Sequence, residues 1–428
     1  MMYYRIQASN LCGSLVIPPS KSHTLRAILF ASMADGKSII RNYLTSPDTQ
    51  AMLCACKQLG ADITVQADAL LIHGCAGSPK TPDNIIDAGN SGQVLRFIAA
   101  IAALTDGYTV LTGDHSIRTN RPIQALLTGL NALNVWAVST QNNGFAPMII
   151  KGPLLGGETT LNGADSQPVS ALLMAAAFAK YPTVIHVDRP GEKPWVDLTL
   201  DWLKRMGIMY QRQGYTQYQL FGNARYAGFE YTVPGDFSSC AFPTIAALIT
   251  NSTLELHGLD KDDVQGDKIL LDVLESCGAQ LQWDQSKKIV TIHPSGTLCG
   301  QTIDVNHFID AVPILTVMAC FMSGETKLTG AGIARHKECD RLAIITQELR
   351  KMGADITEEA EGLRIRPAVL KGAMVSSAQD HRIAMALAIA ALRAEGETII
   401  KEVACVEKSY PGFAQSMQKI GAYIELVV

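Results

Sequence analysis

One feature recurs six times along this chain: a short polar loop that opens directly into a strongly apolar helical run. The first copy is Pro19-Ser20-Lys21-Ser22-His23-Thr24, followed by the apolar run Leu25–Ser32. The six polar heads are spaced by roughly 70 to 75 residues and lie at Ser20, Ser91, Ser166, Ser238, Asp310 and Asp380. Self-similarity at a fixed period indicates that one supersecondary unit is repeated. Six copies of one unit therefore account for the whole chain.

A second set of positions repeats in parallel and marks the ends of six further helices. Each is a Gly or an Asn, the residues that adopt the left-handed conformation of a helix C-cap at little cost. They are Gly60, Asn134, Gly207, Gly278, Gly353 and Gly421. A strand-like run follows each one, so the unit reads helix, strand, helix, strand, strand, with a further strand leading into the next head. Residues 1–18 are expected to form at most a pair of strands, with Gly13 as the turn.

The length and composition limit the architecture and the class of partner. A chain of 428 residues is too long for one core, and six repeats divide most simply into two domains of three. The longest apolar runs, such as Val94–Leu104, are too short to cross a bilayer, and we expect helices buried on all sides. A formal net charge of −4 gives no general attraction to nucleic acid or to an anionic membrane.

The ten cysteines include no Cys-x-x-Cys pair, which argues against a metal site or disulfides and favours reduced thiols in a cytoplasmic protein. The first residues show no basic segment followed by an apolar one, so we expect no signal peptide.

Three apolar head helices in each domain would bundle inside it, with sheets outside and with their N-termini pointing the same way. A helix N-terminus carries unpaired backbone N–H groups and the positive end of the helix dipole. Together these features make a natural site for an anion. Two domains that face each other would direct up to six helix ends into one cleft.

Cationic side chains gather at or near these heads, beside small residues. They are Lys21, Arg26, Arg96, Arg121, Lys337, Arg341, Arg382 and Lys408. Each one alone would be an ordinary surface ion-pair partner. Their corresponding positions in repeated units favour instead an anionic ligand, because Arg suits carboxylate and phosphate groups and Lys supplies a point charge.

Acidic side chains accompany the cations in the second half of the chain: Asp310, Glu338, Asp340 and Asp380, with His381 beside the last of them. If residues 335–341 were helical, Lys337 and Arg341 would lie one turn apart on the same face. A solvated helix start is the alternative, with Glu338 and Asp340 favoured by the helix dipole. The functional interpretation is a carboxylate held among cations for general acid–base catalysis, which requires such a group close to the reacting proton.

The ordered set of these motifs resembles the EPSP synthase family, the 3-phosphoshikimate 1-carboxyvinyltransferases, over nearly the full length. The first-half motifs are Pro19-Ser20-Lys21-Ser22 with Arg26, Gly89-Asn90-Ser91-Gly92 with Arg96, Arg121-Pro122, and Ser166-Gln167 with Ser170-Ala171-Leu172-Leu173-Met174. The second-half motifs are Pro234-Gly235-Asp236-Phe237-Ser238-Ser239, Lys337-Glu338-Cys339-Asp340-Arg341, Asp380-His381-Arg382-Ile383-Ala384-Met385-Ala386 and Lys408-Ser409-Tyr410-Pro411.

The resemblance implies an α/β fold of two similar domains, each with three βαβαββ units around buried parallel helices. This is an inside-out α/β barrel, with the active site in the cleft that the two domains share. The chain would pass between domains near Ser20 and Asp236, giving one discontinuous domain of residues 1–19 plus 236–428 and a second of residues 20–235.

The implied reaction transfers the enolpyruvyl group of phosphoenolpyruvate to the 5-hydroxyl of shikimate 3-phosphate and releases phosphate. It belongs to the shikimate pathway of chorismate and aromatic amino-acid biosynthesis. The resemblance implies no cofactor and no metal, small-molecule substrates only, a cytoplasmic location and a monomer.

Matching positions imply the site residues. The phosphoenolpyruvate set is Lys21, Gly92, Arg121, Gln167, Arg341, Arg382 and Lys408. The shikimate 3-phosphate set is Lys21, Ser22, Arg26, Ser166, Gln167, Asp310 and Lys337. Asp310 would accept the proton of the acceptor hydroxyl, and Glu338, with Lys21 and His381 nearby, would serve proton transfer to the methylene carbon.

Four positions, in three motifs, depart from the family pattern. Asp165-Ser166-Gln167 stands where the family usually has Ser-Ser-Gln, and Glu192-Lys193-Pro194-Trp195 where it usually has Ser-Lys-Pro-Tyr. Gln93 replaces a small Thr, which could alter access for phosphonate inhibitors. We expect Asp165 and Glu192 to turn away or to pair with a base such as Lys193, which would leave Ser166 and backbone amides for the phosphate.

Two alternatives stay open from the residues. One is the sister enolpyruvyl transferase that uses UDP-N-acetylglucosamine; that family relies on a loop Cys among basic residues, which is not evident here. The other is an inactive binding protein on the same scaffold, which the presence of Asp310 and Glu338 disfavours.

Overall fold

The computed structural model describes residues 2–428 and divides the chain into two compact units. One unit comprises residues 1–20 and 234–428, and the other residues 21–233. We call them the discontinuous unit and the continuous unit. The boundaries expected from the sequence, 19/20 and 235/236, differ from these by one and two residues.

Both units are built from four-stranded sheets of one pattern. In the strand orders given below, the first two strands of each of the six sheets are parallel to each other, and all other neighbouring strands are antiparallel. The sheets of the continuous unit have the orders β14(Glu230–Thr232)-β3(Lys37–Arg41)-β5(Ala69–His73)-β4(Asp62–Val65), β6(Ile86–Asp87)-β7(Tyr108–Thr112)-β9(Met148–Lys151)-β8(Trp136–Ser139) and β10(Gly157–Asn162)-β11(Thr183–Asp188)-β13(Gln217–Leu220)-β12(Tyr210–Gln213). Those of the discontinuous unit are β2(Gly13–Val16)-β15(Leu254–His257)-β17(Ile289–His293)-β16(Gln280–Asp284), β18(Thr302–Asp304)-β19(Thr326–Thr329)-β21(Gly362–Arg366)-β20(Asp355–Glu359) and β22(Met374–Ser376)-β23(Thr398–Lys401)-β1(Tyr3–Gln7)-β24(Tyr423–Val427).

The predicted pair of strands in residues 1–18 exists, but its two strands do not pair with each other. β1 pairs with β23 and β24, and β2 pairs with β15. The N-terminal strand therefore completes the sheet of the last repeat, and the strand after it completes the sheet of the fourth. Sequence neighbours separate in this way because three of the six sheets, those of β3, β15 and β23, are completed by a strand from a distant part of the chain.

The helices follow the predicted two sets. The inner helices that begin at the polar heads are α1(Lys21–Met33), α3(Gly92–Ala102), α6(Ser166–Ala176), α8(Phe237–Ile249), α10(Val312–Ala319) and α12(His381–Ala391). The outer set is α2(Pro47–Gln58), α5(Gln124–Ala132), α7(Lys193–Arg205), α9(Ile269–Ser276), α11(Arg341–Lys351) and α13(Phe413–Lys419). Shorter helices complete the list: α4(His115–Thr119), η1(Gly266–Lys268), η2(Asn306–Ala311), η3(Gly332–His336) and η4(Val403–Lys408).

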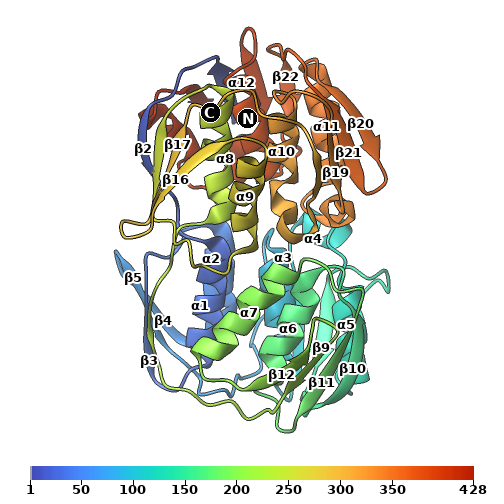
Figure 1. Ribbon diagram of the computed structural model, residues 1–428. Helices are drawn as coiled ribbons and strands as arrows, with labels where there is room; N and C mark the ends of the chain where they lie inside the picture. Colours follow the sequence, from blue (N-terminus) through green and yellow to red (C-terminus); the bar gives the residue numbers. More distant parts are fainter. Residues whose placement is uncertain (1) are drawn as a thin grey trace. The chain divides into compact units, whose positions relative to one another are not determined.

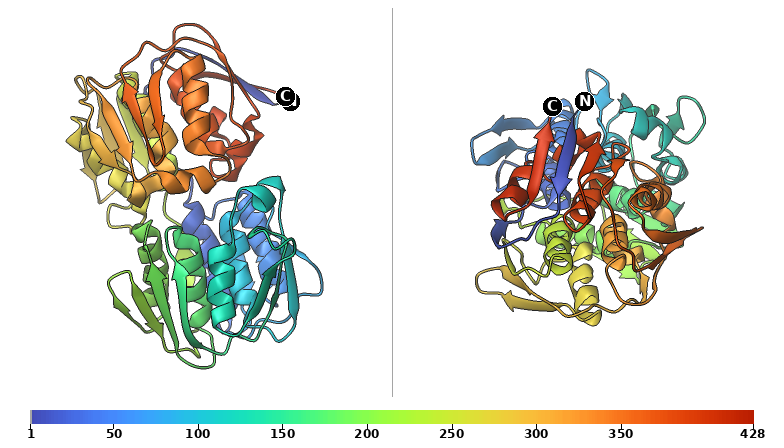
Figure 2. Two further views of the ribbon diagram at one scale, coloured as in Figure 1. Left: turned by 90° about the vertical axis from the view of Figure 1, so that its right-hand side faces the viewer. Right: turned by 90° about the horizontal axis from the view of Figure 1, so that it is seen from above.

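The predicted burial of the inner helices is confirmed. Every residue of α8, α10 and α12 is buried, and α1, α3 and α6 each have one residue that is not. Figure 1 shows that, within each unit, helices occupy the interior and sheets form the outside, and the first view of Figure 2 shows the same layering. The apolar sequence of these helices is thus explained by contact with protein on all sides.

The predicted C-caps are also confirmed. All six Gly and Asn residues that follow the outer helices have positive φ, from 61° at Asn134 to 111° at Gly60. At this point the chain reverses from helix to strand, and a residue with a β-branched side chain would be strained there. None of the described helices is long and apolar enough to cross a membrane.

Candidate active site

In the continuous unit, the starts of α1, α2 and α3 are tied together by a buried carboxylate. Asp48, in the first turn of α2, lies 3.4 Å from Lys21 Nζ and accepts a hydrogen bond of 3.0 Å from Ser91 Oγ. Ser91 is also the N-cap of α3, where its hydroxyl accepts from the backbone N–H of Val94. Gln93 Nε2 donates to Ser22 Oγ at 3.2 Å. The polar heads of two repeats therefore meet in space, as the repeat pattern predicts.

Arg26 lies one turn further into α1 and is buried. Its guanidinium donates to Thr199 Oγ1, to the carbonyl oxygen of Ser22 and to that of Trp195, at 2.9 to 3.3 Å. It also stacks over the ring of Phe97, at 4.9 Å from the centroid. Burial lowers the pKa of Arg26 to about 9. Most of its N–H groups are bound inside the unit, so its clearest role is to join α1 to α7.

The first turn of α3 forms a close cradle around Gly92. A Cβ atom at this position would lie 2.7 Å from Arg96 Nη1, 2.9 Å from Arg121 Nη1 and 3.4 Å from Gln167 Oε1. Arg96 donates to that same Gln167 oxygen at 2.8 Å and to the carbonyl oxygen of Pro122 at 2.7 Å. The structure thus brings together four of the predicted site positions, and two buried guanidinium groups approach a backbone without a side chain. Such a surface suits a small anion.

Asp165 is the N-cap of α6, and it pairs with a base as predicted. Its Oδ1 accepts from the backbone N–H of Gln167 at 2.9 Å, and its Oδ2 lies 3.3 Å from Arg96 Nη2. The base is Arg96 rather than Lys193. A carboxylate at this place is favoured by the dipole of α6 and by the orphan N–H groups of its first turn.

Ser166 is not left available for the phosphate as expected, because it binds the carboxylate of Glu192. Glu192 Oε2 accepts from both the backbone N–H and the Oγ of Ser166, at 3.0 and 3.1 Å, and the side chain of Glu192 is buried. Lys193 instead lies over the ring of Tyr215, with its Nζ 5.4 Å from the centroid. Glu192 has φ of 43°, a left-handed conformation that turns its carboxylate toward α6 rather than toward its neighbour. Both donors of Ser166 therefore already bind a carboxylate.

In the discontinuous unit, three carboxylates meet at one buried guanidinium. Arg341, which is only 1% exposed, contacts Asp310 Oδ1 at 2.7 Å, Glu338 Oε2 at 2.8 Å and Asp380 Oδ2 at 2.7 Å. Burial by itself would lower the pKa of Arg341, but the charges of Asp380, Glu338 and Asp310 together raise it well above its usual range. The guanidinium is therefore a permanent cation that joins the starts of α10, α11 and α12.

Glu338 connects this guanidinium to two further predicted residues. Its Oε1 lies 2.6 Å from Lys408 Nζ and 3.9 Å from His381 Nδ1, while its Oε2 contacts Arg341. All four side chains are buried. A carboxylate between three cationic or protonatable groups can hold and pass a proton, which is the arrangement that general acid–base catalysis needs.

The predicted helical arrangement of Lys337 and Arg341 is wrong. η3 ends at His336, Lys337 has extended backbone with φ of −91° and ψ of −146°, and α11 begins only at Arg341. Asp340 is the N-cap of α11, where it accepts from the N–H of Ala343 at 3.1 Å, so the predicted preference of Asp340 for the helix start is confirmed. The cap interrupts the helix because Asp satisfies an orphan N–H group better from outside it. Lys337 itself is buried next to Glu338.

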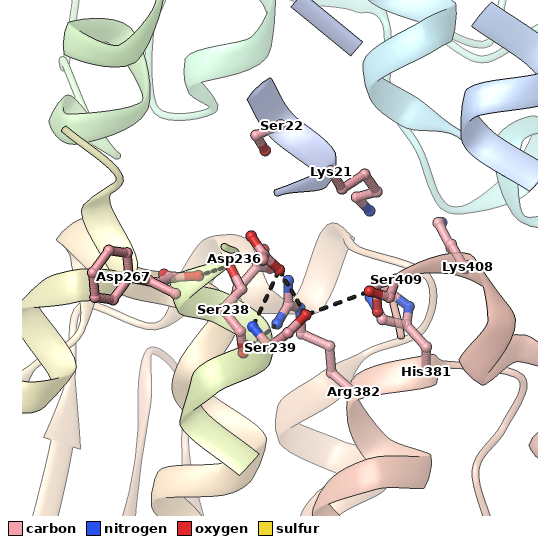
Figure 3. Close-up of polar contacts among 12 residues, drawn as sticks. Lys21, Ser22, Asp236, Ser238, Ser239, Asp267, His381, Arg382, Lys408 and Ser409 are labelled. Atoms are coloured by element: carbon pink, nitrogen blue, oxygen red, sulfur yellow. Dashed lines mark hydrogen bonds and ion pairs between the residues drawn. The ribbon is translucent and has the colours of Figure 1, made fainter. Parts of the chain in front are cut away.

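Arg382 links the start of α12 to that of α8. Its Nη2 lies 3.0 Å from Asp310 Oδ2, and its Nη1 approaches the carbonyl oxygen of Ser238 at 3.4 Å. The next residue, Ser239, donates from its N–H and its hydroxyl to Asp236, the N-cap of α8, and its hydroxyl also reaches the carbonyl oxygen of Ser409 (Figure 3). Arg382 Nε is buried and has no hydrogen-bond partner within the described residues, a donor available for an anion.

Glu338, Asp380 and His381 have ligand atoms within 4.8 Å of one another, a spacing that a metal ion could bridge. However, the oxygens of Glu338 and Asp380 already contact Arg341 and Lys408. A metal ion would have to displace these cations or lie against their positive charge. The group is better explained as an ion-pair network than as a metal site.

Two buried acids that contact the polar heads, one in each unit, belong to no motif that the sequence would reveal. Asp48 follows Ser-Pro and looks like an ordinary first-turn residue, and Asp267 lies in the unremarkable run Gln265-Gly266-Asp267. Their distance along the chain from the heads they contact hides their role. Only the contact of Asp48 with Lys21 and that of Asp267 with Ser238 reveal it.

Comparisons with known proteins show the family to which this chain belongs. The family model for EPSP synthase (3-phosphoshikimate 1-carboxyvinyltransferase) matches residues 6–417. The chain is 41% identical over 426 residues to the 3-phosphoshikimate 1-carboxyvinyltransferase of Ruminiclostridium cellulolyticum, covering 100% of both, and 43% identical over 427 residues to that of Chlamydia pneumoniae, covering 99% of this chain and 95% of the relative. A solved structure of EPSP synthase from Acinetobacter baumannii is similar, with a TM-score of 0.82 and 27% identity over the full length of both chains.

Proposed function

Since this chain belongs to the EPSP synthase family, whose members transfer the enolpyruvyl group of phosphoenolpyruvate to shikimate 3-phosphate, we propose that the two clusters described above bind these substrates and move the protons of the reaction. The observation that carries the proposal is the arrangement at Arg341, where a proton-accepting Asp310 and a proton-carrying Glu338 share one buried cation.

Phosphoenolpyruvate is the more highly charged of the two ligands for its size, and several fixed cations must offset its charge. We assign its binding to the residues that the family motifs imply: Lys21, Gly92, Arg121, Gln167, Arg341, Arg382 and Lys408. Two observations support this assignment: the guanidinium groups of Arg96 and Arg121 approach a backbone without a side chain at Gly92, and the buried Nε of Arg382 has no hydrogen-bond partner within the described residues. Loss of one preorganised donor of this kind typically costs about 10²–10³ in rate.

Shikimate 3-phosphate is assigned to a second set: Lys21, Ser22, Arg26, Ser166, Gln167, Asp310 and Lys337. Within it, Arg26 acts by holding α1 against α7, because most of its donors are bound to Thr199 and to backbone carbonyls. Ser166 contributes to phosphate binding only when its contacts with Glu192 are exchanged for contacts with the phosphate.

The proton steps follow from the carboxylates. Asp310 takes the proton of the acceptor hydroxyl as its oxygen bonds to the central carbon of phosphoenolpyruvate, and Glu338 delivers a proton to the methylene carbon, assisted by Lys21 and His381. The tetrahedral adduct then loses phosphate and a proton from the new methyl group, which restores the double bond. Lys408, at 2.6 Å from Glu338, stabilises the carboxylate after it has given up its proton.

We further propose that the enzyme works in the cytoplasm and that it requires no partner other than these small molecules. The use of reduced cysteines expected from the sequence is consistent with that location.

A phosphate-release assay with phosphoenolpyruvate tests the proposal. Turnover is expected with shikimate 3-phosphate and not with UDP-N-acetylglucosamine, and it should vanish in Asp310→Ala and in Glu338→Ala. Turnover with the nucleotide sugar alone, or full turnover in both variants, would contradict it. Absence of turnover with either acceptor, together with tight substrate binding, would indicate a binding protein on the same scaffold.

A further inference from the structure

One buried carboxylate, that of Asp267, lies outside the proposed substrate site but is linked to it through Ser238. Asp267, in η1, is 1% exposed, and its Oδ2 accepts a hydrogen bond from Ser238 Oγ at the start of α8 (Figure 3). Its second oxygen, Oδ1, has no hydrogen-bond partner within the described residues. An ionised carboxylate needs several donors when it is buried, so this environment gives the charged form little support.

Ser238 connects Asp267 to the proposed phosphoenolpyruvate site. The carbonyl oxygen of Ser238 faces Arg382 Nη1 at 3.4 Å, and Arg382 Nη2 holds Asp310 at 3.0 Å. A continuous set of contacts therefore runs from Asp267 through Ser238 to Arg382 and the proposed proton acceptor. None of the sequence motifs includes Asp267.

Three charged groups act on Asp267, one from each of three neighbouring elements: Asp310 in η2, Arg382 on α12 and Asp236 at the cap of α8. The other acidic and histidine side chains of the elements that pack on η1 are His307, Asp272 and Glu275, and all three are exposed. The charge state of Asp267 therefore acts mainly on Arg382, on the buried Asp236 and on the partly buried Asp310.

We propose that Asp267 is a positioning residue of the reaction assigned above: as a neutral carboxyl it anchors Ser238 and leaves the charge of Arg382 for Asp310 and the anionic substrate. When ionised, Asp267 adds a negative charge behind Arg382. The group of Asp267, Arg382 and Asp310 then changes from a net charge of zero to −1. The added charge weakens the attraction of this corner for phosphoenolpyruvate.

The direction of the pH effect follows from the environment. Burial, reinforced by the charge of Asp310, raises the pKa of Asp267 from its ordinary value of 3.8 to about 7, against the opposing effects of Arg382 and the Ser238 hydrogen bond. Asp267 is then neutral below pH 7 and ionised above it. The wild-type kcat/KM for phosphoenolpyruvate should therefore fall as the pH rises through neutrality.

The kinetic test compares the pH profile of kcat/KM for phosphoenolpyruvate, from pH 5.5 to 9, in the wild type and in Asp267→Asn. The variant keeps the shape and an acceptor for Ser238 but cannot ionise. We expect the decrease of kcat/KM above pH 7 to be about threefold to tenfold smaller in Asp267→Asn than in the wild type. Asp267→Ser is the second uncharged variant, and Asp272→Asn, on the exposed face of α9, is the control with the wild-type profile. Identical profiles in the wild type and both Asp267 variants would overturn the proposal.

A second variant separates the charge from the hydrogen bond. Ser238→Ala removes the hydroxyl contact but keeps Asp267, so the fall above neutrality should persist while kcat/KM is lower at every pH. If Asp267 had only a structural role, kcat/KM would fall equally in Asp267→Asn, Asp267→Ser and Ser238→Ala. The shape of its pH profile would then be the same in all three variants as in the wild type.

Thermal unfolding provides a readout that does not depend on activity. Because the pKa of Asp267 is raised on folding, the folded protein holds this proton more tightly than the unfolded chain. Wild-type stability therefore loses this contribution as the pH rises from about 4 to 7, and the loss is complete above that range. The melting temperature of Asp267→Asn relative to wild type should rise between pH 5 and pH 8. A constant difference would contradict a neutral buried carboxyl.

This inference rests on the proposed function, but the two can fail separately. No turnover of the wild type with shikimate 3-phosphate would overturn the proposed function, while the melting experiment would still test the state of Asp267. Normal wild-type turnover with an unchanged pH profile in Asp267→Asn would overturn only the role of Asp267.

Discussion

The starts of the inner helices differ in chemistry between the two units, although the units share one scaffold. In the continuous unit, the buried Arg26 and Arg96 donate mainly to neutral oxygens of hydroxyl, amide and carbonyl groups. In the discontinuous unit, Arg341 contacts three carboxylates, and Lys408 contacts one of the same three.

The difference teaches how a repeated scaffold can divide the tasks of one reaction. The repeat determines where helix ends and cations lie, and the residues beside them determine whether the cluster binds anions or moves protons. In the continuous unit Lys21 and Arg96 each lie near one carboxylate, Asp48 and Asp165, at 3.4 and 3.3 Å, so their positive charge is compensated less than that of Arg341. Carboxylate partners neutralise the cations of the discontinuous unit and supply the proton-carrying groups. Substitutions in the two clusters should therefore have different kinetic signatures.

The largest effect is expected for Arg341→Ala. The substitution leaves the buried Glu338 and Asp380 and the partly buried Asp310 without their shared cation, which should cost about 3–5 kcal/mol of unfolding free energy and at least about 10³ in kcat/KM. Urea unfolding and phosphate release measure the two losses. Arg364→Ala, which removes an exposed partner of Glu359, is the control and should remain close to wild type in both. A variant of Arg341 that retained wild-type stability would show that the carboxylates do not depend on it.

Glu338→Gln should mainly affect the chemical step. The amide keeps the shape of the side chain and one acceptor but cannot carry the proton, so kcat should fall by about 10²–10⁴. Single-turnover phosphate release separates this step from substrate binding. Glu358→Gln, at an exposed contact of Arg335, provides the control. A large increase in KM with unchanged kcat would place Glu338 in binding rather than in proton transfer.

Gly92→Ala tests the anion cradle of the continuous unit. The new Cβ would lie 2.7 and 2.9 Å from the guanidinium nitrogens of Arg96 and Arg121, which must move. We expect KM for phosphoenolpyruvate to rise about tenfold, with a smaller change in kcat, since a displaced cation weakens binding by about 1.4 kcal/mol. Gly296→Ala is the matched control because a Cβ there meets nothing within 4 Å. Equal effects on both substrates would argue against a phosphoenolpyruvate site at Gly92.

Glu192→Gln should have the smallest effect, and in the favourable direction. The Glu192 carboxylate accepts hydrogen bonds from both the N–H and the hydroxyl of Ser166. A phosphate bound at the start of α6 would be repelled by the negative charge of Glu192. Removal of that charge should lower KM for shikimate 3-phosphate about threefold to tenfold, with kcat nearly unchanged. Steady-state kinetics with each substrate varied in turn measures this. Glu230→Gln, on the exposed strand β14, should change neither constant. A higher KM would instead make Glu192 a contact of the acceptor.

Much of the fold could be predicted because it depends on local rules. Apolar runs after polar heads, and Gly or Asn at the C-caps, are properties of neighbouring residues, so the six inner helices and six positive-φ caps were predictable. The partners of β1 and β2 were not, because strand pairing joins residues that are far apart in the chain. The break of helix between His336 and Arg341 was also missed, since it depends on whether Asp340 lies inside the helix or caps it.

The site was predictable to the extent that its residues lie at repeated heads or match family motifs. The structure brings Gly92, Arg96, Arg121 and Gln167 together, and it joins Asp310, Glu338 and Asp380 at Arg341. Asp48 and Asp267 escaped prediction because burial and contact, rather than local pattern, give them their role. The direction of Glu192 escaped it because one left-handed residue turns the carboxylate toward Ser166.

The sequence by itself determined the repeat, the burial of its inner helices, the family and the set of cationic heads, because each of these depends on composition and order along the chain. The tertiary structure alone decided which acid meets which base. Charges interact through space over a few ångströms, so Arg341 acquires three carboxylates and Ser166 a competitor only when distant repeats fold against one another.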